Sequence, residues 1–91
     1  MLPAMFTVIL KKRAAKQHKK LPKDDQERIL LGLKSLGLNP YAGKKLESDH
    51  NGFWSLRVWP YRIIYTIDKH IVTVTVVAIG DRKDVYRSLN R

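Results

Sequence analysis

The sequence of 91 residues contains no cysteine. Disulfide bonds and cysteine-ligated zinc sites are therefore excluded, and packing has to stabilise the fold. No apolar run approaches the roughly 20 residues of a membrane-spanning helix, and the apolar start at residues 1–5 is too short for a secretion signal. There is also no internal repeat. We therefore expect one domain over residues 1–91, located in the cytoplasm and with no membrane partner.

Acidic residues are also scarce, since 8 Asp and Glu stand against 18 Lys and Arg, a formal charge of +10. An excess of this size favours a polyanionic partner such as nucleic acid. A basic surface that is simply solvated is an equally common outcome in a small protein. Charge alone therefore leaves both interpretations open. The contacts with phosphate that it would supply are independent of sequence.

The first half of the chain predicts a strand and a helical hairpin. Residues 5–10 are apolar and partly β-branched, which favours a strand. Residues 11–20 hold six basic residues, no acid and a thin apolar stripe, which predicts a basic amphipathic helix. Pro22 ends this helix and begins the next, which has acids in its first turns and a stop at Gly37 and Pro40.

The second half predicts a β-meander. After a polar loop at residues 39–52, the hydrophobic period becomes two in residues 53–58, 61–68 and 71–79. The predicted fold class is therefore α+β, with the helical hairpin on one face of a four-stranded antiparallel sheet and a short basic segment at the C-terminus. Of the three histidines, His18 is expected to pack between helices, His50 to lie in a loop and His70 in a turn.

A two-residue loop at Trp59-Pro60 fixes the pairing of the first two meander strands. Arg57 then stands opposite Arg62 on one face, which it shares with Ser55. The other face is apolar and can receive the helices; it comprises Trp54, Leu56, Val58, Tyr61, Ile63, Tyr65 and Ile67.

The paired arginines are a candidate phosphate clamp. Two guanidinium groups opposite each other on a sheet repel, and an anion between them reverses that effect because each presents a fork of donors. The alternative is that an acid such as Asp68 neutralises one of them, or that both are solvated. Geometry alone does not choose between these interpretations.

The segment after Gly80 adds Arg82, Lys83, Tyr86 and Arg87 beside the same sheet face. Neighbouring positive charge is expected to lower the pKa of the Tyr86 phenol, because it favours the phenolate, and the phenolate could act as a general base. The alternative is a tyrosine whose ring packs on the core while its hydroxyl stays in water.

An ordered set of short motifs spans nearly the whole chain. In sequence order these are Lys12-Arg13-Ala14-Ala15-Lys16, Leu21-Pro22, Asn39-Pro40-Tyr41, Lys45-Leu46, Leu56-Arg57-Val58, Tyr61-Arg62-Ile63-Ile64-Tyr65 and Gly80 with Arg82-Lys83-Asp84-Val85-Tyr86. Their order and spacing resemble the RelE/ParE toxin superfamily. The resemblance implies a RelE-like domain acting as the toxin of a type II toxin–antitoxin system. It also implies a RelB-like antitoxin as partner, with operator DNA contacted through that antitoxin.

The RelE branch of this superfamily implies a ribosome-dependent messenger RNA endonuclease. In that reaction the RNA 2′-hydroxyl is the nucleophile, no metal or other cofactor takes part, and translation and growth are inhibited. By resemblance, the catalytic positions are Arg57, Arg62, Arg82 and Tyr86. The residues expected to bind RNA are Lys44, Lys45, Ser55, Lys83 and Arg87.

Two departures from the ribonuclease pattern keep alternatives open. Ser55 stands where a second basic residue is frequent, and Asp81 stands where a basic residue or histidine is frequent. The alternatives are a ParE-like poison of DNA gyrase without enzymatic activity, and a catalytically weakened toxin that binds nucleic acid and regulates its own operon. The presence of both Arg62 and Tyr86 favours the ribonuclease.

Overall fold

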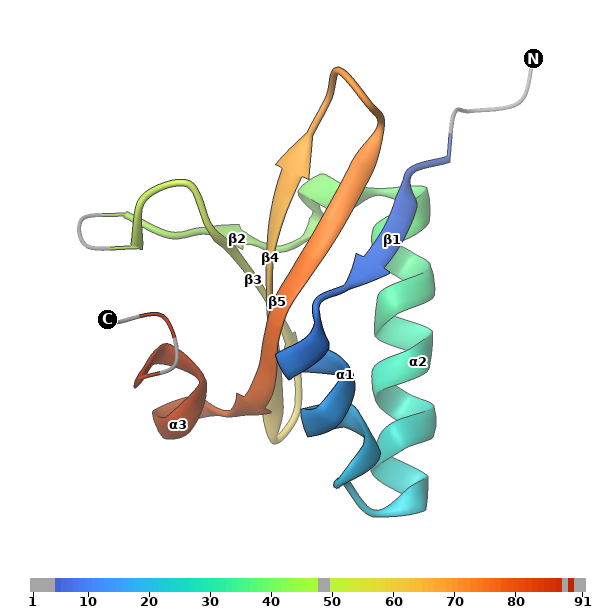
Figure 1. Ribbon diagram of the computed structural model, residues 1–91, viewed down its shortest axis with the longest axis vertical. Helices are drawn as coiled ribbons and strands as arrows, with labels where there is room; N and C mark the ends of the chain where they lie inside the picture. Colours follow the sequence, from blue (N-terminus) through green and yellow to red (C-terminus); the bar gives the residue numbers. More distant parts are fainter. Residues whose placement is uncertain (1–4, 48–49, 88, 90–91) are drawn as a thin grey trace.

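The computed structural model describes residues 5–47, 50–87 and 89. The elements follow one another as β1 (Thr7–Leu10), α1 (Lys12–Lys19), α2 (Lys23–Leu38), the 3-10 turn η1 (Pro40–Ala42), β2 (Lys44–Lys45), β3 (Trp54–Val58), β4 (Tyr61–Asp68), β5 (Thr73–Asp81) and α3 (Arg82–Arg87). The predicted class, α+β with a helical hairpin against a sheet, is confirmed. Figure 1 shows the sheet between the helical hairpin and α3.

The sheet differs from the prediction of four antiparallel strands. Over the described residues it has five strands in the order β1-β5-β4-β3-β2, and β1 lies parallel to β5 while the other pairs are antiparallel. The parallel pair arises because α1, α2 and three strands intervene between β1 and its neighbour. The fifth strand, β2, has only two residues, both lysine, and lies in the segment that the sequence predicts as a loop. Two residues carry no periodicity, so only pairing with β3 reveals this strand.

The last strand is displaced by two residues from its predicted position. Ile71 and Val72 are exposed in the turn before β5, and Val72 adopts a φ of 49°, in the left-handed region. Their apolar, β-branched side chains make them look like strand residues in the sequence. At the other end, β5 continues past the predicted end at residue 79 through Gly80, which pairs with Arg62 inside the sheet.

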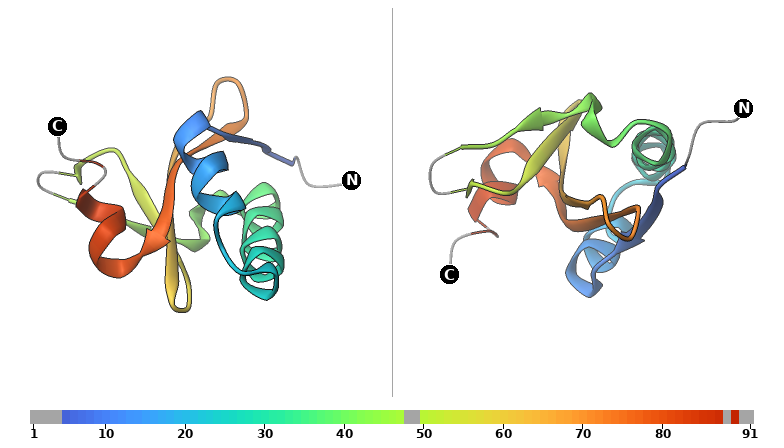
Figure 2. Two further views of the ribbon diagram at one scale, coloured as in Figure 1. Left: turned by 60° about the horizontal axis from the view of Figure 1, so that its bottom comes forward. Right: turned by 90° about the horizontal axis from the view of Figure 1, so that it is seen from above.

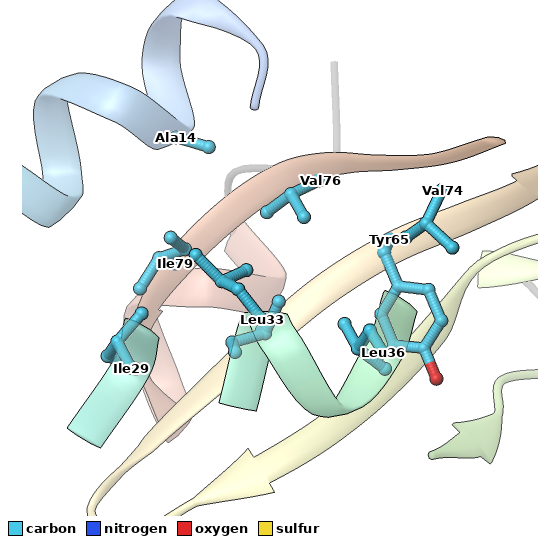
Figure 3. Close-up of a cluster of buried hydrophobic side chains, with 9 residues drawn as sticks. Ala14, Ile29, Leu33, Leu36, Tyr65, Val74, Val76 and Ile79 are labelled. Atoms are coloured by element: carbon cyan, nitrogen blue, oxygen red, sulfur yellow. The ribbon is translucent and has the colours of Figure 1, made fainter. Parts of the chain in front are cut away.

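Helices α1 and α2 cover one face of the sheet, as predicted. His18 Nε2 lies 3.2 Å from the carbonyl oxygen of Gln26, which joins the two helices and confirms the predicted packing role of this histidine. The buried core between the helices and the sheet is shown in Figure 3 and consists of Ala14, Ile29, Leu33, Leu36, Ile63, Tyr65, Val74, Val76 and Ile79. All seven residues of the predicted apolar face belong to this core or pack against it. Burial of these side chains is the main stabilising term of the fold.

The opposite face of the sheet carries a second, smaller core. The C-terminal segment predicted as a basic tail is the helix α3, and its Val85 is fully buried against Ile64 and Ala78. Figure 2 shows α3 on the side of the sheet away from α2. Most residues of α3 are charged, so no helical hydrophobic period marks this segment in the sequence. Through Val85, the second core fixes α3 over the face that carries the paired arginines.

A polar contact fastens the β3–β4 hairpin to the start of α2. The hydroxyl of Tyr61 donates a hydrogen bond of 2.6 Å to the Asp25 carboxylate, which also forms an ion pair with Arg28. Arg28 in turn donates to the carbonyl oxygen of Trp59 at 2.7 Å. These contacts lower the pKa of Asp25 from its ordinary 3.8, the bond from Tyr61 contributing most and Arg28 next. They also raise the pKa of Tyr61, mainly through its bond to Asp25.

The lowered pKa of Asp25 predicts a specific acid sensitivity. The folded protein holds the carboxylate ionised to lower pH than the unfolded chain does, so the stabilisation is complete above the unfolded pKa of 3.8 and is lost as pH falls through the folded value. In urea unfolding from pH 6 down to pH 3, we expect wild type to be more stable than Asp25→Asn at pH 6 and the two curves to converge below about pH 4.

The matched control for this prediction is Asp24→Asn, which removes one carboxylate from the same helical turn without touching Tyr61. A convergence of equal size in that variant would show that the hairpin contact is not the cause. At alkaline pH the same contact responds to pH in the opposite direction. Because folding raises the pKa of Tyr61, its hydrogen bond to Asp25 stabilises the fold below about pH 10, and this stabilisation is lost as the pH rises through the folded pKa of Tyr61.

Candidate functional site

The β3–β4 hairpin has the register that the sequence predicts. Val58 pairs with Tyr61 across the Trp59-Pro60 turn, and the next pair places Arg57 opposite Arg62. The Trp59-Pro60 peptide bond is cis. The adjacent pairing of β4 with β5 sets Arg62 opposite Gly80 and Tyr61 opposite Asp81. Arg82, the next residue along, is thereby delivered to the same end of the sheet.

Three of the four predicted catalytic residues line one pocket. This pocket has a volume of about 190 Å³ and is lined by Arg57, Trp59, Pro60, Tyr61, Arg62 and Arg82. Arg57 and Arg82 are exposed, whereas Arg62 is half-buried. No carboxylate lines the pocket among the residues that the structure describes there, so the three guanidinium groups give it a strongly positive potential. A phosphate is the ligand that such a set of forked donors suits best.

Ser55 joins the fourth predicted catalytic residue to this pocket. The Ser55 Oγ atom accepts a hydrogen bond from Arg62 Nη1 and another from the Tyr86 hydroxyl, each at 3.4 Å. The serine is only 2% exposed, so its contacts are with the protein. A lysine or arginine at this position would place a third charge beside Arg62. The serine instead supplies one small acceptor that holds Arg62 and Tyr86 together.

His50 lies beside Tyr86, an arrangement that the sequence does not reveal. The two ring centroids are 5.7 Å apart with an interplanar angle of 31°. The His50 Nδ1 atom is buried and has no hydrogen-bond partner among the described residues. The sequence predicts only a loop residue here, which is correct for the backbone. No signal in the sequence could have found the contact, because 36 positions separate the two rings and neither belongs to a motif with the other.

The predicted RNA-binding lysines and arginine are all exposed, at different distances from the pocket. Lys44 pairs with Ser55 across the β2–β3 ladder, so it lies at the edge of the site, and Lys45 is the next residue outward. Lys83 lies in α3 and lines a second hollow that shares Trp59 and Arg82 with the first. Arg87 forms an ion pair of 3.9 Å with Asp84 of its own helix.

A buried tyrosine sets the position of β2 beneath the site. The Tyr65 hydroxyl donates to the carbonyl oxygen of Pro40 at 2.7 Å and accepts from the Gly43 backbone N–H at 3.2 Å. Burial raises the pKa of Tyr65, so the ring stays neutral and available as a donor. These two bonds fix the chain just before Lys44, and the β2–β3 pairing then carries that position to Ser55.

These contacts bring the three arginines and the Tyr86 hydroxyl to one surface of the sheet. The arginines can bind a phosphate and stabilise the extra negative charge of a five-coordinate phosphorus. The Ser55 Oγ atom lies between the Tyr86 hydroxyl and Arg62 Nη1, and the His50 ring lies beside the Tyr86 ring.

Among the residues that the structure describes, no helix combines the length and the apolar character of a membrane-spanning segment.

Comparison with known proteins identifies the family and the fold of this chain. Residues 8–86 match the family model described as the ParE toxin of the type II toxin–antitoxin system parDE. No curated protein gives a significant sequence match. A chain of the toxin–antitoxin complex RelBE2 from Mycobacterium tuberculosis is 26% identical with a TM-score of 0.82, and the alignment covers 89% of this chain and 95% of that one.

Two further solved structures show the same fold at lower identity. A chain of the archaeal RelE–RelB complex from Pyrococcus horikoshii is 23% identical, with a TM-score of 0.75 and coverage of 87% of this chain and 97% of that one. A chain of the YoeB–YefM complex from Staphylococcus aureus is 22% identical, with a TM-score of 0.68 and coverage of 85% and 97%. With the family match over residues 8–86, the chain belongs to the ParE toxin family of type II toxin–antitoxin systems, within the RelE/ParE superfamily.

Proposed function

We propose that this toxin is a metal-independent messenger RNA endonuclease that acts on ribosome-bound messages. The observation that carries the proposal is the convergence of Arg57, Arg62 and Arg82 on one pocket, with Tyr86 joined to Arg62 through Ser55. Cleavage of a phosphodiester uses a tyrosine hydroxyl joined to an arginine pocket, and a gyrase poison without enzymatic activity does not require that combination. The similar solved structures include RelE and YoeB toxins, which supports the same branch.

The proposed reaction uses a nucleophile that the RNA itself supplies. The 2′-hydroxyl oxygen attacks the adjacent phosphorus, the bond from phosphorus to the 5′-oxygen breaks, and a 2′,3′-cyclic phosphate and a 5′-hydroxyl result. The phenolic oxygen of Tyr86 is the proposed general base for the proton of the 2′-hydroxyl. Arg57 and Arg62 stabilise the charge on the phosphoryl oxygens, and Arg82 holds the phosphate beside the leaving oxygen, which gains a proton from water.

In this proposal Ser55 and the peripheral lysines have supporting roles. Ser55, which the sequence predicts as an RNA-binding residue, is proposed here as a positioning residue, because its Oγ atom contacts both Arg62 and Tyr86 and the residue is only 2% exposed. Lys44, Lys45 and Lys83 bind the RNA backbone on either side of the cleaved linkage, and Arg87 adds to the positive field. Contacts of this kind raise affinity without reading the base sequence.

We also propose that a RelB-like antitoxin holds the toxin inactive and contacts operator DNA on behalf of the pair. The Mycobacterium tuberculosis relative was solved as a toxin–antitoxin complex. On this chain, an apolar groove of about 580 Å³ between β1 and α2 is open to such a partner; it is lined by Met5, Phe6, Val8, Leu10, Leu30, Leu33, Lys34, Gly37 and Leu38. Met5, Leu30 and Leu38 in this groove are exposed, and an apolar groove beside a helix is a common binding surface for a partner segment.

The decisive test is the fate of messages after the chain is expressed without an antitoxin. We expect growth to stop within minutes and new 5′-hydroxyl ends to accumulate inside translated reading frames. The measurement is sequencing of messenger 5′ ends before and after induction. A message whose start codon has been removed serves as the matched control and should stay intact, because it does not enter ribosomes.

Other outcomes would reject this function. Intact messages together with DNA breaks trapped on gyrase would select the gyrase poison. Normal growth with intact messages would select a weakened toxin that only binds nucleic acid.

The proposed reaction uses no metal ion bound to the toxin. Brief treatment of the isolated toxin with a chelator of divalent ions, before it is mixed into a reconstituted translation reaction, should therefore leave the cleavage rate unchanged. The rate is measured in samples stopped at intervals.

A further inference from the structure

We propose that Trp59 is a stacking platform for one RNA base beside the arginine pocket. This proposal rests on the proposed function and adds a nucleotide-binding subsite to it. Trp59 lies in the turn between β3 and β4 and is 64% exposed, a large fraction for an indole ring. The same side chain lines the pocket that holds Arg57, Arg62 and Arg82.

The ring of Trp59 is oriented by a cation. The Cζ atom of Arg57 lies over the indole at 5.3 Å from the ring centroid, within the range of a cation–π contact. The carbonyl oxygen of the same tryptophan accepts a hydrogen bond of 2.7 Å from Arg28, which fastens the turn to α2. A ring held at its backbone and over one face has little conformational entropy left to lose when a base stacks on it.

The other tryptophan shows what a structural ring looks like in this protein. Trp54 is half-buried and packs against two other rings, Tyr41 at 5.6 Å and Tyr65 at 6.3 Å between centroids. Tyr41 in turn contacts Phe6 at 6.5 Å. Trp59 belongs to neither described hydrophobic core, and the ring contact described for it is the one with Arg57. Packing therefore does not account for Trp59, whereas a ligand would.

Trp59 lines two hollows whose charges differ. Arg57, Arg62 and Arg82 line the first, where the phosphate binds in the proposed function. In the second, the carboxylates of Asp81 and Asp84 stand beside the cations of Arg82 and Lys83, so the formal charges balance. Asp81 is held there by bonds from the backbone N–H groups of Lys83 at 3.1 Å and Asp84 at 3.0 Å. The arginine pocket therefore attracts a phosphate more strongly than this second hollow does, and the exposed Trp59 ring between the two sets of residues suits an uncharged base.

Base stacking also suits the chemistry of the site. A single-stranded RNA held only by its phosphates can slide, and one stacked base fixes the register of the chain relative to the arginines. Every base has a π-face, so Trp59 is expected to add affinity and register with little dependence on which base is stacked.

The test compares RNA with and without bases. The probes are a fluorescein-labelled 12-nucleotide single strand with 2′-fluoro sugars, which lack the nucleophile, and an abasic chain of the same length and charge. Wild type should bind the base-carrying chain more tightly, and Trp59→Ala should weaken that binding about tenfold while leaving abasic binding unchanged. Trp59→Phe should recover most of the affinity. Ile71→Ala, in the exposed turn before β5, is the control for loss of an exposed apolar side chain.

The outcomes separate this proposal from the proposed function. Equal binding of the base-carrying strand by wild type and Trp59→Ala would overturn the stacking platform, and messenger cleavage by wild type would still stand. A tenfold loss on both chains would also overturn it, because Trp59 would then act by holding Arg57 in place. Loss of antitoxin binding with unchanged RNA binding would reassign the exposed ring to the protein partner. Thermal melting of each variant confirms that the fold is retained.

Discussion

Replacing Arg62 with alanine should slow messenger cleavage by about 10²–10³-fold, with growth arrest relieved accordingly. Arg62 is the residue that belongs to both parts of the site, since it lines the arginine pocket and donates to Ser55. Its removal takes away one of the charges that stabilise the five-coordinate phosphorus, and it leaves Ser55 with a single partner. The measurement is the single-turnover rate of message cleavage in a reconstituted translation reaction, because this rate reports the chemical step.

Three variants show which contact is responsible. Tyr86→Phe keeps the ring beside His50 and against the second core but removes the hydroxyl, so a comparable loss is expected if that oxygen takes the proton. Ser55→Ala should give a smaller loss, in the rate more than in RNA affinity, because serine acts through its two neighbours. Lys69→Ala removes one positive charge from the far end of β4 and should change little. Wild-type cleavage rates in both Arg62→Ala and Tyr86→Phe would refute the site.

Replacing Gly43 with alanine should lower the free energy of unfolding by about 3 kcal/mol, because it overpacks the chain and disturbs a buried hydrogen bond. An added Cβ would lie 2.7 Å from the carbonyl oxygen of Ser55 and closer still to the Tyr65 hydroxyl. Neither neighbour can yield easily, since one is backbone in β3 and the other is fully buried and bonded to Pro40. The melting temperature of a domain of this size should fall by roughly 10–20 °C.

The matched control for Gly43 is another glycine at the edge of the site. A Cβ at Gly80 would meet Val85 at 3.7 Å, an ordinary van der Waals distance, so Gly80→Ala should leave the melting temperature nearly unchanged. Both proteins are melted under identical conditions, and residual folded Gly43→Ala is assayed for cleavage at low temperature. There the variant should also cleave slowly, because displacement of β2 moves Ser55. Equal melting temperatures for the two variants would mean that β2 is not held as the structure indicates.

The hairpin that carries the arginines was predictable because two strong local constraints agree. The hydrophobic period of two assigns one face of β3 and β4 to the core, and a two-residue loop then leaves one register available. The structure has that register, with Arg57 opposite Arg62. Helices α1 and α2 were predictable for a similar reason, since Pro22 separates them and their apolar stripes are periodic.

The prediction failed where an element's identity depends on a distant partner. The sheet lacks the purely antiparallel order because β1 finds its neighbour in β5, more than sixty residues away. β2 exists only through its pairing with β3, and α3 is a helix whose few apolar side chains are matched to Ile64 and Ala78. None of these partners leaves a local period that a sequence reading could detect.

The sequence by itself determined the class of fold, the superfamily and the register of the arginine hairpin, because each depends on local patterns or on ordered motifs. Only the tertiary structure decided how the site is joined together. It brought Arg82 to the pocket through the β4–β5 pairing, made Ser55 the shared acceptor of Arg62 and Tyr86, and set His50 against the Tyr86 ring. These contacts form between side chains on separate elements, and packing on both faces of the sheet fixes the distances between those elements.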